Sequence, residues 1–178
     1  MEDLSANELD SISYLIGDDR IVRLDTALDL CRRLELGVML DLKAGRDSRE
    51  FLEEIDGLLV KHDLSNAAIS ISGSMAARRF LKHVRFTPTT EEMHRLRAGE
   101  RLDLRHRFWF GLPQQLQPGD VTKLKSSGAL IIPAINTFRY PASRHLELAK
   151  DDIERLTKEG VDGFQIDSVY HRFLDNQE

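Results

Sequence analysis

The chain of 178 residues has a single cysteine, Cys31, and its glycines and prolines are scattered rather than pooled. One cysteine cannot form an internal disulfide, and no set of cysteines and histidines has the spacing of a structural zinc site. The first residues lack the basic and apolar regions of a signal peptide, and no apolar run approaches the length of a membrane span. These absences predict a cytoplasmic protein with no integral membrane contact.

A strong excess of positive charge is also missing. The sequence has 25 Lys and Arg against 30 Asp and Glu, which gives a formal net charge of -5. Binding to nucleic acid is therefore not favoured, and a small ligand that is neutral or locally charged fits better. Because 41% of the residues are hydrophobic and no repeat or linker-like tract is evident, the sequence predicts one globular domain over residues 1–178.

Strand-like segments alternate with helical segments along the chain. Apolar or alternating runs predict strands at 37–43, 67–72, 83–86, 108–111, 130–135 and 163–167. Helical spacing and cap residues predict helices over 22–35, after Asp47 or Ser48, after Gly73-Ser74, and over 151–160. This alternation predicts an α/β fold with a mainly parallel sheet and right-handed crossovers.

Two architectures use such an alternation, an open doubly wound sheet and a closed β/α barrel. The absence of a glycine-rich turn after the first strand favours the barrel. An ordinary barrel of this type closes with eight strands, and only six are predicted here. We therefore expect an incomplete TIM-type β/α barrel with about six of eight βα units, the first two missing before residue 1. Its two exposed sheet edges would favour a homo-oligomer or a partner that covers them.

The first predicted strand ends with an acid and a base. Asp41 and Lys43 share one side of this strand with Met39, whereas the alternate residues are apolar. The carboxyl ends of barrel strands carry the active site in β/α-barrel enzymes. Asp41 and Lys43 are therefore candidate site residues, and the alternative is an ion pair at the surface.

Three segments carry a resemblance to a known family: the strand end Asp41-Leu42-Lys43, the strand Ile69-Ser70-Ile71-Ser72, and Gly160-Val161-Asp162-Gly163 before the last strand. They resemble the later part of the glycerophosphodiester phosphodiesterases, barrel enzymes of the phospholipase-C-like phosphodiesterase superfamily. Residues 4–12 also look like the helix that follows the second catalytic histidine in that family.

The resemblance implies divalent-metal-dependent hydrolysis of a glycerophosphodiester to glycerol 3-phosphate and an alcohol. By this match Asp41 is a metal ligand, for Mg²⁺ or Ca²⁺, and Lys43 contacts the phosphate. The His-Arg-Gly motif, the Glu-x-Asp pair and the His-Asp element that serve catalysis in the family belong to its first two βα units, and no segment of this sequence matches those units. No catalytic residue is therefore carried over, and the chain alone is expected to be inactive.

The segment after the fifth predicted strand supplies further candidates for binding a small-molecule phosphodiester. Where the family often has Trp-Thr-Val-Asn, this chain has Pro133-Ala134-Ile135-Asn136, so Phe138 or Tyr140 could replace the indole. Arg139 could contact a phosphate through its forked donors, and His145 would lie near the barrel mouth. The alternative is that both aromatic side chains only cover the end of the barrel.

Three interpretations remain open on the sequence alone. The chain is the C-terminal portion of a phosphodiesterase, or a non-catalytic module that binds phosphate or a phosphodiester, or a structural scaffold that needs oligomerisation for stability.

Overall fold

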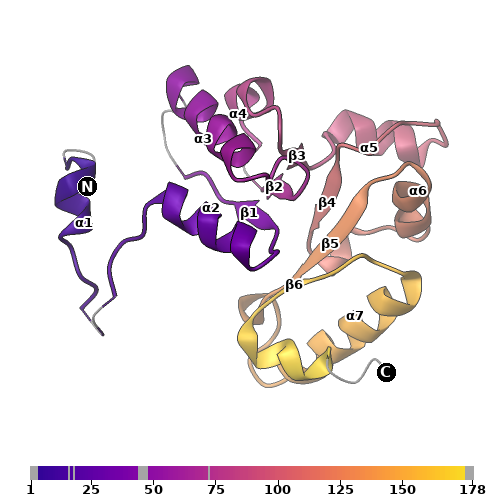
Figure 1. The fold of residues 1–178 in the computed structure, drawn as a ribbon. Helices are drawn as coiled ribbons and strands as arrows, with labels where there is room; N and C mark the ends of the chain where they lie inside the picture. Colours follow the sequence, from indigo (N-terminus) through magenta and orange to yellow (C-terminus); the bar gives the residue numbers. More distant parts are fainter. Residues whose placement is uncertain (1–3, 16, 18, 44–47, 72, 175–178) are drawn as a thin grey trace. The chain divides into compact units, whose positions relative to one another are not determined.

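The computed structural model describes residues 4–15, 17, 19–43, 48–71 and 73–174 (Figure 1). These residues form two compact units, and each is described by itself. Unit 1 takes the described residues within 1–69 and 74–84, and unit 2 those within 70–73 and 85–178. One domain over residues 1–178 stays a prediction.

All six predicted strands are present. They are β1 (Val38–Leu40), β2 (Ala68–Ser70), β3 (Arg85–Phe86), β4 (Phe108–Gly111), β5 (Leu130–Ile135) and β6 (Gln165–Ile166). Between and around them lie α1 (Ala6–Asp10), α2 (Leu24–Arg33), α3 (Arg49–Lys61), α4 (Met75–Phe80), α5 (Thr90–Arg97), η1 (Pro113–Gln115), α6 (Asp120–Ser126), η2 (Thr137–Arg139), α7 (His145–Glu159) and η3 (Ser168–Phe173). The predicted α/β alternation is confirmed, and the described strands do not close into a barrel.

Serine side chains begin two helices of unit 1, as the sequence predicts. The N–H of Phe51 donates to Ser48 Oγ at 3.2 Å at the start of α3. The N–H of Ala77 donates to Ser74 Oγ at 3.0 Å at the start of α4. Each cap satisfies a backbone donor that has no partner inside its helix, which is typically worth about 1 kcal/mol.

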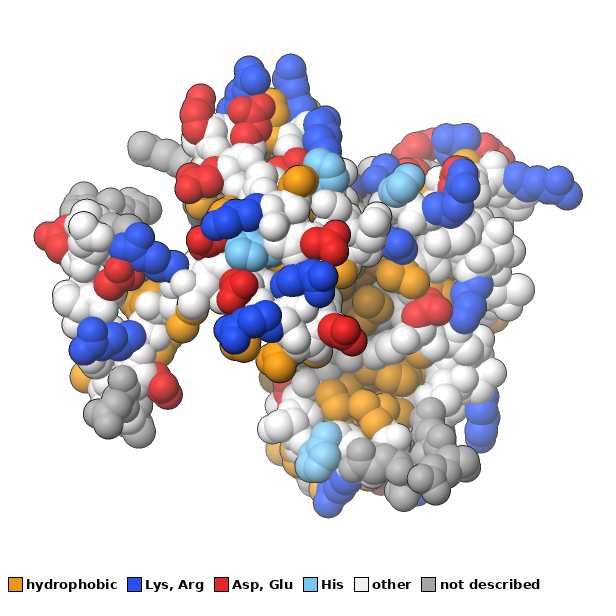
Figure 2. Space-filling view, viewed as in Figure 1, with side chains coloured by type: hydrophobic (Ala, Val, Ile, Leu, Met, Phe, Trp, Pro, Cys, Tyr) orange, Lys and Arg blue, Asp and Glu red, His pale blue; other side chains and the backbone are white. Residues whose placement is uncertain are grey.

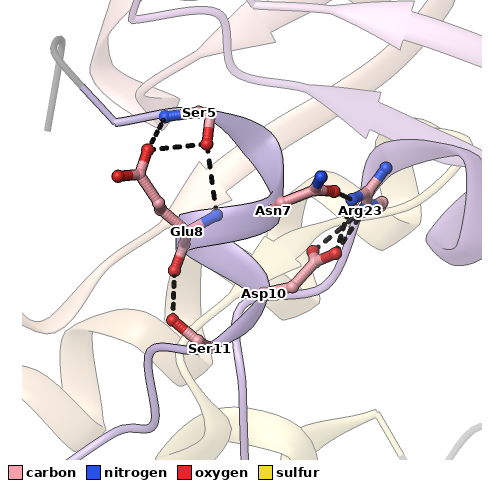
Figure 3. A network of polar contacts seen from close by, with 6 residues as sticks. All are labelled: Ser5, Asn7, Glu8, Asp10, Ser11 and Arg23. Carbon is pink, nitrogen blue, oxygen red and sulfur yellow. Dashed lines mark hydrogen bonds and ion pairs between the residues drawn. The ribbon is translucent and has the colours of Figure 1, made fainter.

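The segment before α2 is ordered by exposed polar contacts (Figure 3). Ser5 and Glu8 form a capping box, in which the N–H of Ser5 donates to Glu8 Oε2 at 2.7 Å. Arg23 donates through Nη2 to Asn7 Oδ1 at 2.9 Å and through Nε to Asp10 Oδ2 at 2.9 Å. Because these groups are exposed, they guide the path of the chain more than they stabilise the fold.

Two aspartates join the helices of unit 1. Asp25 in α2 lies 2.7 Å from Lys61 Nζ and 2.6 Å from His62 Nε2 at the end of α3. The contact with His62, and then that with Lys61, lowers the pKa of Asp25. Asp56 in α3 accepts from two backbone N–H groups after α4 and lies 2.9 Å from His83 Nδ1. Both histidines therefore position secondary-structure elements.

The sheet of unit 2 is parallel. β4 pairs with β5 from Phe108 with Leu130 to Gly111 with Pro133, and β5 pairs with β6 through Ala134 with Gln165 and Ile135 with Ile166. Adjacent parallel strands have their carboxyl ends at the same edge of the sheet. The residues that follow β5 and β6, Asn136 and Asp167, are brought together by this register.

Two hydrophobic clusters pack against this sheet. The first joins α5 and α6 to β4 and β5 through Met93, Leu96, Leu104, Trp109, Val121, Leu124, Ala129 and Ile131. The second joins α7 and η3 to β5 through Ile135, Tyr140, Ala149, Ile153, Leu156 and Tyr170. Trp109 is only 6% exposed, so its ring belongs to the core.

Helix α7 begins at His145, before the predicted start at residue 151. Its buried stripe is Ala149, Ile153 and Leu156, and the first of these is too small to mark an apolar face clearly in sequence. The helix ends as predicted at Gly160, whose φ of 84° lies in the left-handed region that favours glycine.

Asp162 fixes the beginning of β6 against β5. Its N–H donates to the Ile131 carbonyl at 3.0 Å, and its Oδ2 accepts from the Ile131 N–H at 2.8 Å. Lys125 Nζ donates to the Gly160 carbonyl and to Asp162 Oδ1. The segment Gly160–Gly163 therefore has a structural function at the amino ends of the strands.

Both signs of charge are interspersed on the face that Figure 2 shows. Among the described residues, no helix combines the length and the apolar character that crossing a bilayer requires.

Among the described residues of unit 2, the most deeply buried ion pair joins α5 to α6. Arg97 Nη2 lies 2.7 Å from Asp120 Oδ2, and the side chains are 26% and 2% exposed. The same carboxylate oxygen accepts from the Gln117 N–H at 2.9 Å. A carboxylate buried this deeply needs such partners to offset its desolvation.

We expect Asp120→Ala to lower the free energy of unfolding by about 2 to 3 kcal/mol, because it removes the buried carboxylate that accepts from Arg97 and from the Gln117 N–H. Urea denaturation measures the change. The control is Asp29→Ala, which removes an exposed contact with Arg33 and should cost less than about 0.5 kcal/mol. Equal losses in the two variants would contradict the role of Asp120.

Candidate functional site

Asp41 and Lys43 follow β1 in unit 1. Lys43 Nζ lies 3.0 Å from Asp41 Oδ2, and the two side chains are 82% and 45% exposed. Leu40, one position before Asp41, is buried, so Asp41 points away from the packed face of its strand. The structure brings the two predicted residues together as an exposed ion pair, which also agrees with the alternative that the sequence left open.

Phe138 and Arg139 lie in η2, directly after β5 in unit 2. The Arg139 guanidinium carbon lies 4.6 Å from the centre of the Phe138 ring, which is a cation–π distance. Phe138 is 71% exposed, so both the ring and the guanidinium are accessible to a ligand. This pair offers an exposed ring and an exposed cation directly after β5.

A residue that the sequence analysis did not select, Asp167, organises this loop. Its Oδ2 accepts from the Thr137 N–H at 2.6 Å and from the Thr137 hydroxyl at 2.8 Å. Its Oδ1 accepts from Asn136 Nδ2 at 3.3 Å. The Thr137 N–H first, and then its hydroxyl, lowers the pKa of Asp167 below 3.8. The sequence signal that could have identified Asp167 is that polar residues, Asn136 and Asp167, directly follow two neighbouring parallel strands.

His145 is the first residue of α7, and Tyr140 contacts the same helix. His145 Nδ1 lies 3.1 Å from the hydroxyl oxygen of the fully buried Tyr170, and His145 itself is half-buried. Tyr140 is 9% exposed and donates to Asp152 Oδ2 at 3.0 Å, and burial raises its pKa. Tyr140 is therefore a core residue, which leaves Phe138 as the candidate replacement for the indole.

The described residues do not bring together three His, Cys, Asp or Glu side chains that could hold one metal ion. In protein sites Ca²⁺ takes six to eight oxygen ligands, and octahedral Mg²⁺ is held by one or two carboxylates together with waters or substrate phosphates. An exposed carboxylate with a lysine at 3.0 Å does not fit such an ion by itself. The assignment of Asp41 as a metal ligand stays a prediction.

No family model and no curated protein matches this chain. Solved structures do match, and three of them carry the name glycerophosphodiester or glycerophosphoryl diester phosphodiesterase. The protein from Galdieria sulphuraria has a TM-score of 0.65 and 15% identity over 97% of this chain and 70% of its own. The protein from Agrobacterium tumefaciens strain C58 has a TM-score of 0.57 and 16% identity over 87% of this chain and 62% of its own. The protein from Silicibacter pomeroyi DSS-3 has a TM-score of 0.56 and 17% identity over 88% of this chain and 57% of its own.

These likenesses confirm the predicted resemblance at the level of the fold. The described α/β arrangement, in which parallel strands alternate with helices, is similar to that of the three matched structures. The chain spans 57% of the length of the Silicibacter protein and 62% of the Agrobacterium protein. The activity and the ligands of a whole enzyme are therefore matters for a proposal.

The Asp167 network predicts a titration in the loop after β5. Because the folded-state pKa is lowered, the network contributes stability above the ordinary pKa of 3.8, and the contribution is lost as pH falls through the lower folded-state value. We expect the amide resonance of Thr137 to titrate with a midpoint below 3.8 in ¹H–¹⁵N spectra. Asp167→Asn should abolish this titration and Asp29→Asn should leave it unchanged. A midpoint at or above 3.8 would refute the network.

Proposed function

We propose that this chain is part of a glycerophosphodiester phosphodiesterase-family protein and binds a small phosphodiester. In the complete family enzyme the reaction is metal-dependent hydrolysis to glycerol 3-phosphate and an alcohol. The observation that carries the proposal is the fold shared with three phosphodiesterase structures, with polar side chains after β1 and β5 where barrel enzymes hold their ligands.

In unit 2, Arg139 and Phe138 are the proposed contacts for a phosphodiester. A guanidinium presents two parallel N–H donors to phosphate oxygens. Because Arg139 already stacks on Phe138, its side chain loses less conformational entropy when it binds a ligand. The exposed ring offers an apolar surface to the glycerol carbons. His145 is proposed as a further contact through the ring nitrogen that does not face Tyr170.

In unit 1, Lys43 is proposed as a phosphate contact, because its ammonium group is exposed and acts as a compact positive charge. Asp41 is proposed as a ligand of Mg²⁺ or Ca²⁺ only in a complete barrel that supplies further carboxylates. Since the described donor set does not fit such an ion, we assign no catalytic step to this chain alone.

The second candidate function is a non-catalytic module that binds phosphate or a phosphodiester. It is favoured by the lack of a three-residue metal cluster in the described part of the chain. Self-association that covers the edges at β1 and β6 is also a proposal, and sedimentation velocity tests it.

Calorimetry with glycerophosphocholine tests the binding site. We expect saturable binding, and an approximately tenfold loss of affinity in Arg139→Ala, because one charge-assisted contact is removed. The matched control is Arg79→Ala, since Arg79 also stacks on a ring, that of Phe80 at 5.3 Å, but lies on α4. If Arg139→Ala binds as tightly as Arg79→Ala, Arg139 is not a ligand contact.

A hydrolysis assay separates the two candidate functions. With Mg²⁺ or Ca²⁺ present, we expect the chain alone to release no glycerol 3-phosphate from glycerophosphocholine, because it lacks the family's catalytic histidines. Release that disappears in Asp41→Ala and with a chelator would instead support an active enzyme. Release that survives Asp41→Ala would contradict the metal role of Asp41.

A further inference from the structure

A cavity of about 520 Å³ opens between the carboxyl ends of α5 and α6 in unit 2. Its lining includes Leu96, Glu100, Arg101, Leu102, Lys123 and Ser127. The segments after α5 and α6 lead to the amino ends of β4 and β5, so the cavity lies at the end of these strands opposite to the loop with Arg139. Its volume is within the range of small-molecule sites in proteins.

The cavity contains hydrogen-bond donors that the fold does not use fully. Within the described part of the chain, nothing pairs with the side chain of Arg101. Its neighbour Glu100 is held instead by Arg95, with 2.8 Å between Oε2 and Nε. Lys123 Nζ donates to the Arg97 carbonyl at 2.9 Å, which leaves two of its three protons for another acceptor.

The local charge favours an anion. The ends of α5 and α6 contribute about half a negative charge each. Arg101 and Lys123 contribute two positive charges, and Glu100 is neutralised by Arg95. The balance is about one positive charge, although the whole chain is acidic.

The floor of the cavity is apolar. Leu96 is 3% exposed and belongs to the cluster that joins α5, α6, β4 and β5, and Leu102 packs against the same cluster. A ligand that fits both the donors and the floor must therefore carry a charged head on a short apolar body.

We propose that this cavity binds a small organic anion, with its carboxylate or phosphate on Arg101, Lys123 and the Ser127 hydroxyl and its chain over Leu96 and Leu102. Guanidinium groups bind such heads through two parallel hydrogen bonds. The site is separate from the proposed phosphodiester site and does not depend on hydrolysis.

Hexanoate is the probe, and ¹H–¹⁵N spectra of the full chain give the readout. We expect saturable shifts of the amides in residues 99–102 and 123–128. Arg101→Ala should weaken binding about tenfold. The matched control is Arg79→Ala, which removes an exposed arginine outside the cavity and should leave the affinity for hexanoate unchanged. Ser126→Trp, which fills the cavity while keeping its charges, should also abolish the shifts.

Three results would overturn the proposal. Absence of a saturable shift would exclude the ligand class. Equal binding of 1-hexanol would show that the charge is not recognised. Shifts confined to residues 136–145 would place the anion in the loop after β5 instead.

Discussion

The parallel pairing of β5 with β6 determines the geometry of the candidate site in unit 2. Because Ile135 lies beside Ile166, the next residues of each strand emerge at the same edge, and Asp167 meets Asn136 and Thr137 there. The carboxylate holds the loop that begins at Thr137, and this loop presents Phe138 and Arg139 to solvent. A shift of one residue in this register would move the Asp167 carboxylate away from the Thr137 donors, and the loop would lose these hydrogen bonds.

Aspartates make many of the connections between elements in this acidic chain. Asp25 joins α2 to α3, Asp56 holds the segment after α4, and Asp120 joins α6 to α5. Asp162 and Asp167 hold opposite ends of the β5–β6 pair. Each carboxylate accepts from two or more donors, and for the buried Asp120 these donors offset the cost of desolvation. The charges of the chain therefore specify tertiary contacts.

The strands could be predicted from the sequence because their apolar runs are short and bounded by turn residues. The caps at Ser48 and Ser74 were equally visible, since a cap is a local signal. The partners of Asp120 and Asp167 could not be identified from the sequence, because Arg97 and Thr137 lie far from them along the chain. Burial of Tyr140 depends likewise on its packing against α7 and Tyr170. Asp41 and Lys43 were predicted as a pair at a strand end, but no feature of the described residues distinguishes a ligand contact from an ion pair there.

The Gly160–Gly163 segment carries much of the family resemblance, and every contact described for it is architectural. Gly160 ends a helix, and Asp162 aligns two strands through the backbone of Ile131. Selection for folding alone would preserve such a motif in proteins that had lost catalytic activity. Homology searches that rely on it will therefore group enzymes with inactive descendants, and only the residues that touch the substrate can separate the two.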